Sequence, residues 1–319
     1  MALEISENNR ILKRIFMKKY LLPLCAIFSL TQVHADIRNE FENIYVKAAN
    51  TLLFFTSENI ISSGSYEFGD DDSTLKTTFL PITYHFKSDS DFYNFYLNGS
   101  IGYSKYRETN VDVNRESLDT IKIKTYALKL GGGVRLNILK DTDMMLGGSY
   151  IYSKVNSDYI TDKPLTTNPV DRALNYVFNS NNTFNTYELF TSVGYHPTIS
   201  EYKPYVRGDI RYFDTDIDDP FATISDTSST ISKLKLGLIT PSVISIDGLP
   251  LKLEFYASNV FISGDMREAL DTNDFYVLGT TLHLGTTTLN DWVSDVSFDV
   301  NIVRGDNLDG FNFGFGLSF

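Results

Sequence analysis

The last eleven residues, Asp309 to Phe319, constrain the fold of this chain more than any other stretch. They read D-G-F-N-F-G-F-G-L-S-F, so every second residue is apolar and bulky while the residues between are small or polar. A strict period of two predicts a β-strand with one apolar and one polar face. The apolar face carries Phe311, Phe313, Phe315, Leu317 and Phe319, and the other carries Asn312, Gly314, Gly316 and Ser318.

The composition narrows the class of protein. A helical membrane protein needs apolar runs of about 20 residues, and none follows residue 35. The 319 residues include 20 Tyr and 23 Phe, yet the mean hydropathy is only −0.14. A transmembrane β-barrel combines these two properties because its apolar residues stand at alternate positions. The net charge of −12 argues against nucleic acid as a partner.

Residues 17–35 have the features of a secretory leader. A basic start at Met17–Lys19 precedes a short apolar core, Leu21–Leu30, and a small-residue cleavage site that ends at Ala35. We therefore expect export with cleavage near Ala35, and Met17 is a better start than Met1. The single cysteine, Cys25, lies in this leader, so the mature chain is expected to have no disulfide.

Residues 36–58 follow a different period. Their apolar residues recur at steps of three and four, which predicts an amphipathic helix. The apolar stripe is Ile37, Phe41, Ile44, Tyr45, Ala48, Leu52 and Phe55, and the opposite face holds Arg38, Glu40, Glu42, Asn43 and Lys47. Such a helix could pack on the periplasmic rim of a barrel or plug its lumen, and the sequence leaves both places open.

From residue 59 to residue 319 the period of two returns, broken by turn-rich segments. In the clearest segments, such as Tyr93–Tyr103 and Tyr126–Ile138, apolar residues take one face and polar or charged residues the other. Charged side chains are costly against lipid, so the charged face is expected to line a wet lumen. The predicted lumen-lining residues are Arg207, Asp209, Arg211, Lys233, Lys235, Lys252, Glu254, Asp295 and Asp299.

Twelve segments of this kind predict an all-β fold, a transmembrane antiparallel up-and-down barrel of about 12 strands. An even count is typical of single-chain bacterial barrels with both termini in the periplasm. The predicted strands lie near 59–68, 75–86, 92–106, 119–138, 144–157, 184–197, 203–214, 230–245, 250–262, 274–286, 292–304 and 309–319. Short connections at 87–91, 140–143, 197–201, 247–250 and 287–291 alternate with longer ones at 106–118, 156–182, 215–229 and 263–273, as periplasmic turns and outer loops would.

With these elements, residues 50–319 resemble the solitary autotransporter-type β-barrels of Gram-negative outer membranes, a translocator barrel without its passenger. The resemblance rests on a helix leading into the first strand, on Leu80–Tyr84 followed by Phe92–Tyr103, and on the ending Gly314–Phe319. Only some two dozen residues separate Ala35 from the first strand, too few for a folded passenger domain.

The resemblance implies a place in the outer membrane, among outer-membrane lipid and lipopolysaccharide. It also implies that periplasmic chaperones and the barrel-assembly machinery handle the chain. In such barrels the last strand is read during insertion, which implies that Phe315 and Phe319 are the assembly signal.

The chemistry of the chain predicts no catalytic site. Outer-membrane hydrolases need a histidine beside a serine or acidic partners near the outer leaflet. His85, His196 and His283 all fall at the periplasmic ends of predicted strands. No phosphate loop, zinc spacing or nucleotide fingerprint occurs, so we expect no cofactor and no metal site.

Three functions therefore remain open from the sequence. The first is a non-enzymatic barrel with a structural or surface role. The second is a porin-like passive channel for small solutes, because a barrel of about twelve strands lies between filled barrels and open porins. An outer-membrane enzyme is a remote third.

Overall fold

The computed structural model describes residues 61–69, 73–86, 88, 90–111, 119–160, 179, 181–218, 226–286 and 295–318. Over these residues the chain is almost entirely β-strand. The strands are β1 (Ile61–Phe68), β2 (Ser73–His85), β3 (Tyr93–Val111), β4 (Asp119–Leu139), β5 (Thr142–Ile160), β6 (Asn181–Tyr195), β7 (Lys203–Asp218), β8 (Thr227–Ile239), β9 (Ile244–Ile246), β10 (Leu249–Gly264), β11 (Asp274–Gly285), β12 (Asp295–Gly305) and β13 (Leu308–Ser318). The predicted leader, the predicted helix 36–58 and Phe319 lie outside the described residues.

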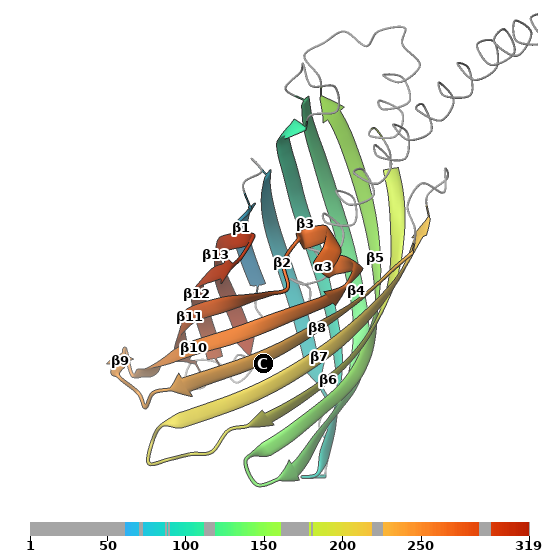
Figure 1. The fold of residues 1–319 in the computed structure, drawn as a ribbon. Coiled ribbons are helices and arrows are strands. Elements are labelled where there is room, and N and C mark those ends of the chain that lie inside the picture. The colour runs from blue at the N-terminus through green and yellow to red at the C-terminus, as the bar shows by residue number, and fades with distance from the viewer. Residues whose placement is uncertain are drawn as a thin grey trace, which may run out of the picture. The chain divides into compact units, whose positions relative to one another are not determined.

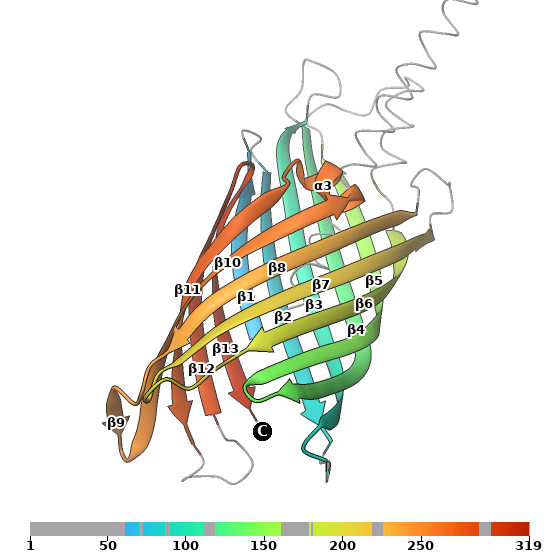
Figure 2. The ribbon, with the colours of Figure 1, turned by 60° about the horizontal axis from the view of Figure 1, so that its bottom comes forward.

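These strands close into an antiparallel barrel (Figures 1 and 2). Neighbours in the chain pair with each other, β8 pairs with β10, and β13 returns to β1 with a register that runs from Ile61–Phe315 to Phe68–Leu308. The three-residue β9 pairs with the start of β10 and stands outside the ring of twelve. Closure gives every strand two neighbours, which is the condition for crossing lipid. The predicted twelve-stranded barrel is confirmed.

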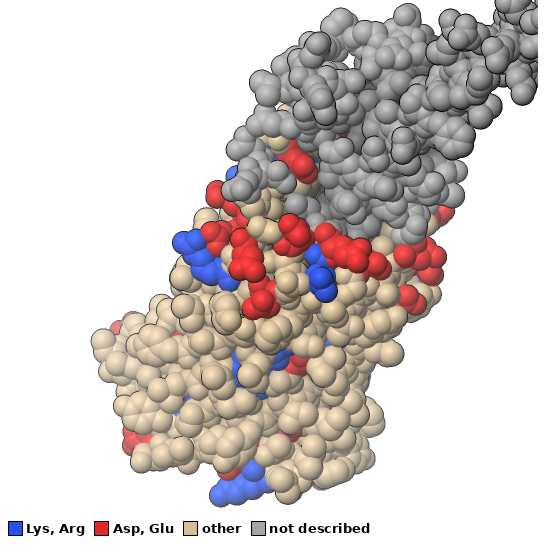
Figure 3. Space-filling model, in the orientation of Figure 1, with Lys and Arg blue, Asp and Glu red and all other residues tan. Residues whose placement is uncertain are grey.

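The period of two separates an outer from an inner face. On β13 the side chains of Phe311, Phe313 and Phe315 are 53, 50 and 41 % exposed, whereas Gly314 between them is buried. The apolar face therefore points outward to lipid and the polar face into the lumen. Figure 3 shows one face of the outer surface, which has a broad band with few charged residues and a row of mostly acidic residues above it.

Several strands are longer than the sequence predicts. β3 continues to Val111, β5 to Ile160 and β7 to Asp218, so parts of the predicted outer loops are strand. These extensions pass beyond the lipid, where both faces carry polar residues and the alternation fades. At the other end, the predicted strand 230–245 is divided, because β8 ends at Ile239 and the chain bends at Pro241 before β9.

The fourth predicted outer loop contains a short helix, α3 (Asp265–Leu270), that the sequence does not reveal. Six residues are too few for a helical period to be read. The helix is held to β8, because the backbone N–H of Met266 donates to Ser229 Oγ at 2.9 Å. Met266 and Leu270 are buried, at 0 and 2 % exposed. In the part of the chain that the structure describes, no helix is long and apolar enough to span a membrane.

An apolar collar lines the outer half of the lumen, toward the end opposite to the start of β1. Each of the twelve barrel strands contributes at least one inward apolar side chain that is no more than 4 % exposed. The collar consists of Tyr66, Phe68, Leu75, Phe79, Tyr106, Ile121, Ile123, Ile151, Val155, Phe184, Phe213, Ile231, Val260, Ile262, Phe275, Val303 and Leu308. The nine charged residues that the sequence predicts in the lumen lie between this collar and the periplasmic end.

Candidate functional site in the polar lumen

The central triad joins three strands near the middle of the lumen. Lys129 on β4 places Nζ 2.6 Å from Oε2 of Glu188 on β6, and Nη1 of Arg211 on β7 donates to Oε1 of Glu188 at 2.6 Å. Glu188 and Lys129 are only 1 and 3 % exposed. Charge-assisted contacts of this kind are strong when they are shielded from water, so the triad fixes β4, β6 and β7 relative to one another.

Small residues on β5 make the triad possible, since β5 lies between β4 and β6. At this level β5 turns Gly147 and Ser149 inward, and Ser149 stands opposite Glu188 in the strand register. A Cβ at Gly147 would collide with the ring of Phe190 on β6. The Lys129–Glu188 pair therefore crosses β5 beside Gly147 and Ser149, which have no large side chain to block it.

The Asp143 cluster lies nearer the periplasmic end. Asp143 on β5 is 1 % exposed, and its Oδ2 lies 2.8 Å from Nε of Arg135 on β4 and 3.2 Å from Nη2 of Arg207 on β7. His196, just after β6, brings Nδ1 to 3.6 Å from Oδ1. A Cβ at Gly194 on β6 would meet both Asp143 and Arg207. A glycine on the intervening strand again leaves room for a bridge across it.

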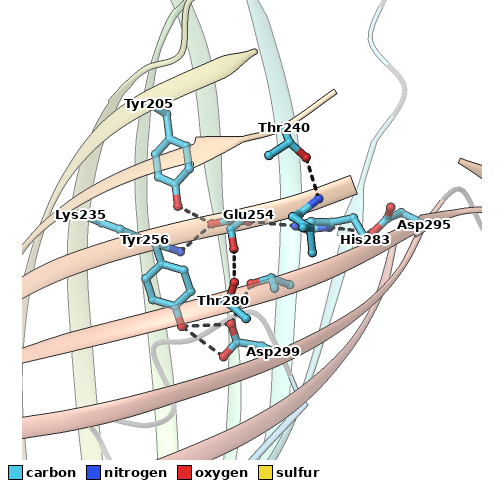
Figure 4. A network of polar contacts seen from close by, with 11 residues as sticks. Tyr205, Lys235, Thr240, Glu254, Tyr256, Thr280, His283, Asp295 and Asp299 are labelled. Carbon is cyan, nitrogen blue, oxygen red and sulfur yellow. Dashed lines mark hydrogen bonds and ion pairs between the residues drawn. The ribbon is translucent and has the colours of Figure 1, made fainter. Parts of the chain in front are cut away.

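The Glu254 network occupies the next part of the wall, from β7 to β12 (Figure 4). The carboxylate of Glu254 on β10 accepts hydrogen bonds from the hydroxyl of Tyr205 on β7 and from Nζ of Lys235 on β8, the latter at 3.2 Å. His283 on β11 lies between two carboxylates, with Nε2 2.9 Å from Glu254 and Nδ1 3.2 Å from Asp295 on β12. Four neighbouring strands and β12 are thus joined through one buried carboxylate and one imidazole.

The Glu254 network also includes a second chain of contacts, which reaches the closing strands. The hydroxyl of Tyr256 donates to Asp299 at 3.0 Å, Asn301 donates to Asp299 at 2.8 Å, and Asn312 donates to Asn301 at 3.0 Å. Asn312 on β13 in turn accepts a hydrogen bond from the hydroxyl of Tyr66 on β1. Polar side chains therefore cross the seam where the barrel closes, in addition to the backbone ladder.

Four inward tyrosines stand directly opposite a glycine on the next strand. Tyr205 faces Gly237, and Tyr256 faces Gly279. In each pair an added Cβ on the glycine would collide with the tyrosine ring. Nζ of Lys235 lies 3.8 Å from the centroid of the Tyr256 ring, a cation–π distance. The other two pairs are Tyr66 with Gly310 and Tyr96 with Gly133.

Replacing Gly237 with alanine is expected to lower the free energy of unfolding by about 1–3 kcal/mol, because the new methyl group displaces the Tyr205 ring from Glu254. The unfolding midpoint in denaturant, measured on the folded barrel in detergent, reports the change. Gly208→Ala on β7 is the matched control, since nothing lies within 4 Å of its added Cβ, and its effect should stay within about 0.5 kcal/mol. Equal effects at the two glycines would contradict the pairing argument.

All nine predicted lumen residues stand at inward positions of their strands. The networks bring together Arg207, Arg211, Lys235, Glu254, Asp295 and Asp299. Asp209, Lys233 and Lys252 are not part of the central triad, the Asp143 cluster or the Glu254 network. The alternation in the sequence also puts Lys129, Arg135 and Tyr205 on the inward face, although the list of predicted lumen-lining residues does not include them. Asp143 and Glu188 are likewise absent from that list.

The comparisons with known proteins agree with this geometry. A family model described as the solitary outer membrane autotransporter beta-barrel domain matches residues 52–315. No curated protein matches the sequence.

Three autotransporter barrels are similar in structure. The β domain of the Bordetella autotransporter Brka has a TM-score of 0.55 and 10 % identity, over 81 % of this chain and 97 % of that chain. The transport unit of AIDA-I from Escherichia coli has a TM-score of 0.54 and 10 % identity, over 88 % of this chain and 99 % of that chain. The translocator domain of NalP from Neisseria meningitidis has a TM-score of 0.54 and 12 % identity, over 91 % of this chain and 98 % of that chain.

At these identities the solved structures show a shared fold, and the family model, which covers most of the chain, shows the family. The protein is an autotransporter translocator-like barrel of the Gram-negative outer membrane, and the chain belongs to the solitary outer membrane autotransporter beta-barrel family.

Proposed function

We propose that this barrel has a non-enzymatic structural or surface role, and that residues 36–58 plug its lumen. The observation that carries the proposal is the apolar collar. A barrel of 8 strands is just filled by its own side chains, so the wider ring of twelve has interior space that its own side chains fill less completely. Side chains on all twelve strands are nonetheless buried to 4 % exposure or less. An element of about helix width inside the ring would account for this burial.

Residues 36–58 have the right chemistry for that occupant. Their apolar stripe, which includes Phe41 and Leu52, would meet the collar, while the opposite face carries charged residues suited to the polar lumen. The wall of β3–β6 also offers room, because many of its inward residues are small. These small residues are Ser100, Gly102, Ser104, Thr125, Ala127, Gly131, Gly133, Gly147, Ser149, Ser153 and Ser192.

The second candidate function is a passive channel for small solutes. The observation that favours it is the charged lower half of the lumen, where cations and carboxylates of the three networks could line an ion path. The collar weighs against it, because an apolar ring that is filled by an occupant opposes the passage of hydrated solutes.

Conductance in planar lipid bilayers separates these two functions. The mature chain, which we propose begins at Asp36 after cleavage at Ala35, is expected to show little steady conductance. The same chain without residues 36–58 is expected to show large, steady openings because the collar loses its occupant. A large steady conductance from the intact mature chain would overturn the plug and support the channel.

We also propose that none of the three histidines is catalytic. His283 is held between Glu254 and Asp295, and His196 lies beside Asp143, both within networks that join strands. His85 ends β2, with its ring 6.0 Å from that of Tyr96. Contacts that bridge neighbouring strands account for His283 and His196, so neither of these two needs a catalytic role to explain its position.

The proposed partners follow from the location. They are the lipid and lipopolysaccharide around the barrel, together with the assembly machinery and the periplasmic chaperones that deliver it. The acidic net charge continues to argue against nucleic acid.

A further inference from the structure

The outer face of β2–β5 changes from apolar to cationic toward the outer end of the barrel, and on β3, β4 and β5 aromatic residues lie between the two. Moving toward the outer end, the outward residues of β3 are aliphatic at Ile101, aromatic at Tyr103 and cationic at Lys105 and Arg107. The other three strands also carry cations beyond their apolar residues. Together the six outward cations form a basic patch, which consists of Lys76, Lys105, Arg107, Lys122, Lys124 and Lys154.

The strand register places these cations directly beside one another. Lys76 stands opposite Lys105, and Lys105 stands opposite Lys124, so three lysines form one row across β2, β3 and β4. In the next row Arg107 stands opposite Lys122. Directly opposite side chains have Cβ atoms only about 4.5–5.5 Å apart, and like charges at that spacing repel. An anion between the rows would relieve this repulsion.

The protein itself supplies little compensating charge. Asp158 on β5 lies 3.5 Å from Lys124, and it is the acid that contacts the patch. Within the described ranges, no acidic side chain lies within ion-pair distance of the remaining five cations. Another outward cation near this rim, Arg304, is by contrast paired with Asp309 at 2.5 Å.

The height of the patch matches the polar headgroups of the outer leaflet. Just below it, the rings of Tyr103 and Tyr126 pack with centroids 5.1 Å apart. Below these rings Ile101 and Leu128 are 60 and 47 % exposed on the lipid face. Tyrosines of transmembrane barrels gather where hydrocarbon gives way to headgroups, so the lysines directly above them stand at headgroup level.

The patch is confined to one side of the barrel. On β7 the outward positions beyond Tyr212 are Asp214, Asp216 and Asp218. The face shown in Figure 3 likewise has mostly acidic residues above its uncharged band. Charged residues that served only solubility would not place cations on one side of the barrel and carboxylates on another. A site for an anionic ligand would.

We propose that the basic patch on β2–β5 binds the phosphate groups of lipopolysaccharide in the outer leaflet. The ligand's acyl chains lie against the apolar band below the tyrosines, and its phosphates lie between the two rows of cations. A lipid fits better than a second copy of the chain, because the patch continues directly from the lipid-facing surface and sits at the level where lipid phosphates occur. The site does not depend on whether the lumen is plugged.

Native mass spectrometry of the mature barrel in detergent tests this site, with bisphosphorylated lipid A as the probe and lipid A lacking both phosphates as its partner probe. Lys105→Gln/Lys124→Gln removes two charges from the central row. Lys140→Gln/Lys203→Gln is the matched control, because it removes two exposed lysines at the periplasmic end. The patch variant and the dephosphorylated probe should each weaken binding about tenfold or more, and the control variant should bind as the wild type does.

The folding of the patch variant is checked by its melting midpoint without lipid. That midpoint should stay close to the wild-type value, because the repulsion removed between like charges offsets the loss of the exposed Lys124–Asp158 pair. Three results would overturn the site: equal binding by the patch variant and the wild type, equal binding of the two probes, or self-association that the patch variant loses while its lipid binding is unchanged. The last result would assign the patch to a second copy.

Discussion

Replacing Glu188 with glutamine is expected to lower the free energy of unfolding by about 3–5 kcal/mol, the usual cost of removing one partner from a buried ion pair. Lys129 and Arg211 both approach this carboxylate at 2.6 Å, and Glu188 is almost wholly buried. The substitution keeps the shape of the side chain but leaves two cations without the charge they share. Denaturant unfolding of the refolded barrel measures the effect.

Two companion variants make this result interpretable. Asp158→Asn breaks the exposed pair with Lys124, whose side chains are 40 and 56 % exposed, and should cost less than about 1 kcal/mol. Lys129→Met combined with Glu188→Gln removes one of the two cations, so the double variant should be more stable than Glu188→Gln alone. A single variant that costs no more than the Asp158 control would show that the lumen is wet enough to solvate the triad.

The strands and their two faces could be predicted because lipid imposes a strict rule. Between the headgroups, every outward residue must tolerate hydrocarbon, so Phe311, Phe313 and Phe315 alternate with small inward residues. Beyond the headgroups, outward residues no longer need to tolerate hydrocarbon. The ends of β3 and β5 carry polar residues on both faces, and there the sequence gives no reason to prefer strand over loop.

The contacts within the lumen could not be predicted, because they depend on register. Inward position can be read from alternation, which identifies Arg211 and Glu254 as lumen residues. Alternation does not say that Lys129 meets Glu188 across β5, since that contact requires the alignment of three strands. The inward position of Asn312 is likewise evident, but its link to Tyr66 depends on how β13 closes against β1.

The apolar collar was missed for a related reason. Its residues stand at inward positions that we expected to be polar, and the expectation of a wet lumen came from the charged residues of the lower half. Tyr66 and Phe184 are apolar on the inner face because the outer half of the barrel is packed rather than solvated. Sequence periodicity distinguishes the inner from the outer face, but it does not reveal what fills the interior.

Replacing Phe319 with alanine is expected to lower the amount of barrel in the outer membrane severalfold while leaving the stability of assembled barrels nearly unchanged. The reason is the proposed role of Phe315 and Phe319 as the signal read during insertion. If Phe319 faces lipid, as the sequence alternation predicts, the loss of its ring should by itself cost at most about 2 kcal/mol. The band shift between unheated and boiled samples on cold gels reports both the amount of folded barrel and its resistance to heat.

Phe313→Ala separates recognition from simple burial. Phe313 lies on β13 and is 50 % exposed on its outward face, so its loss removes one aromatic ring from lipid. If β13 is read through Phe315 and Phe319, the Phe313 variant should reach the membrane in nearly normal amounts and melt slightly earlier. Equal losses of membrane-inserted barrel for the Phe313 and Phe319 variants would mean that apolar area alone drives insertion, and the assignment of a signal to those two residues would then be wrong.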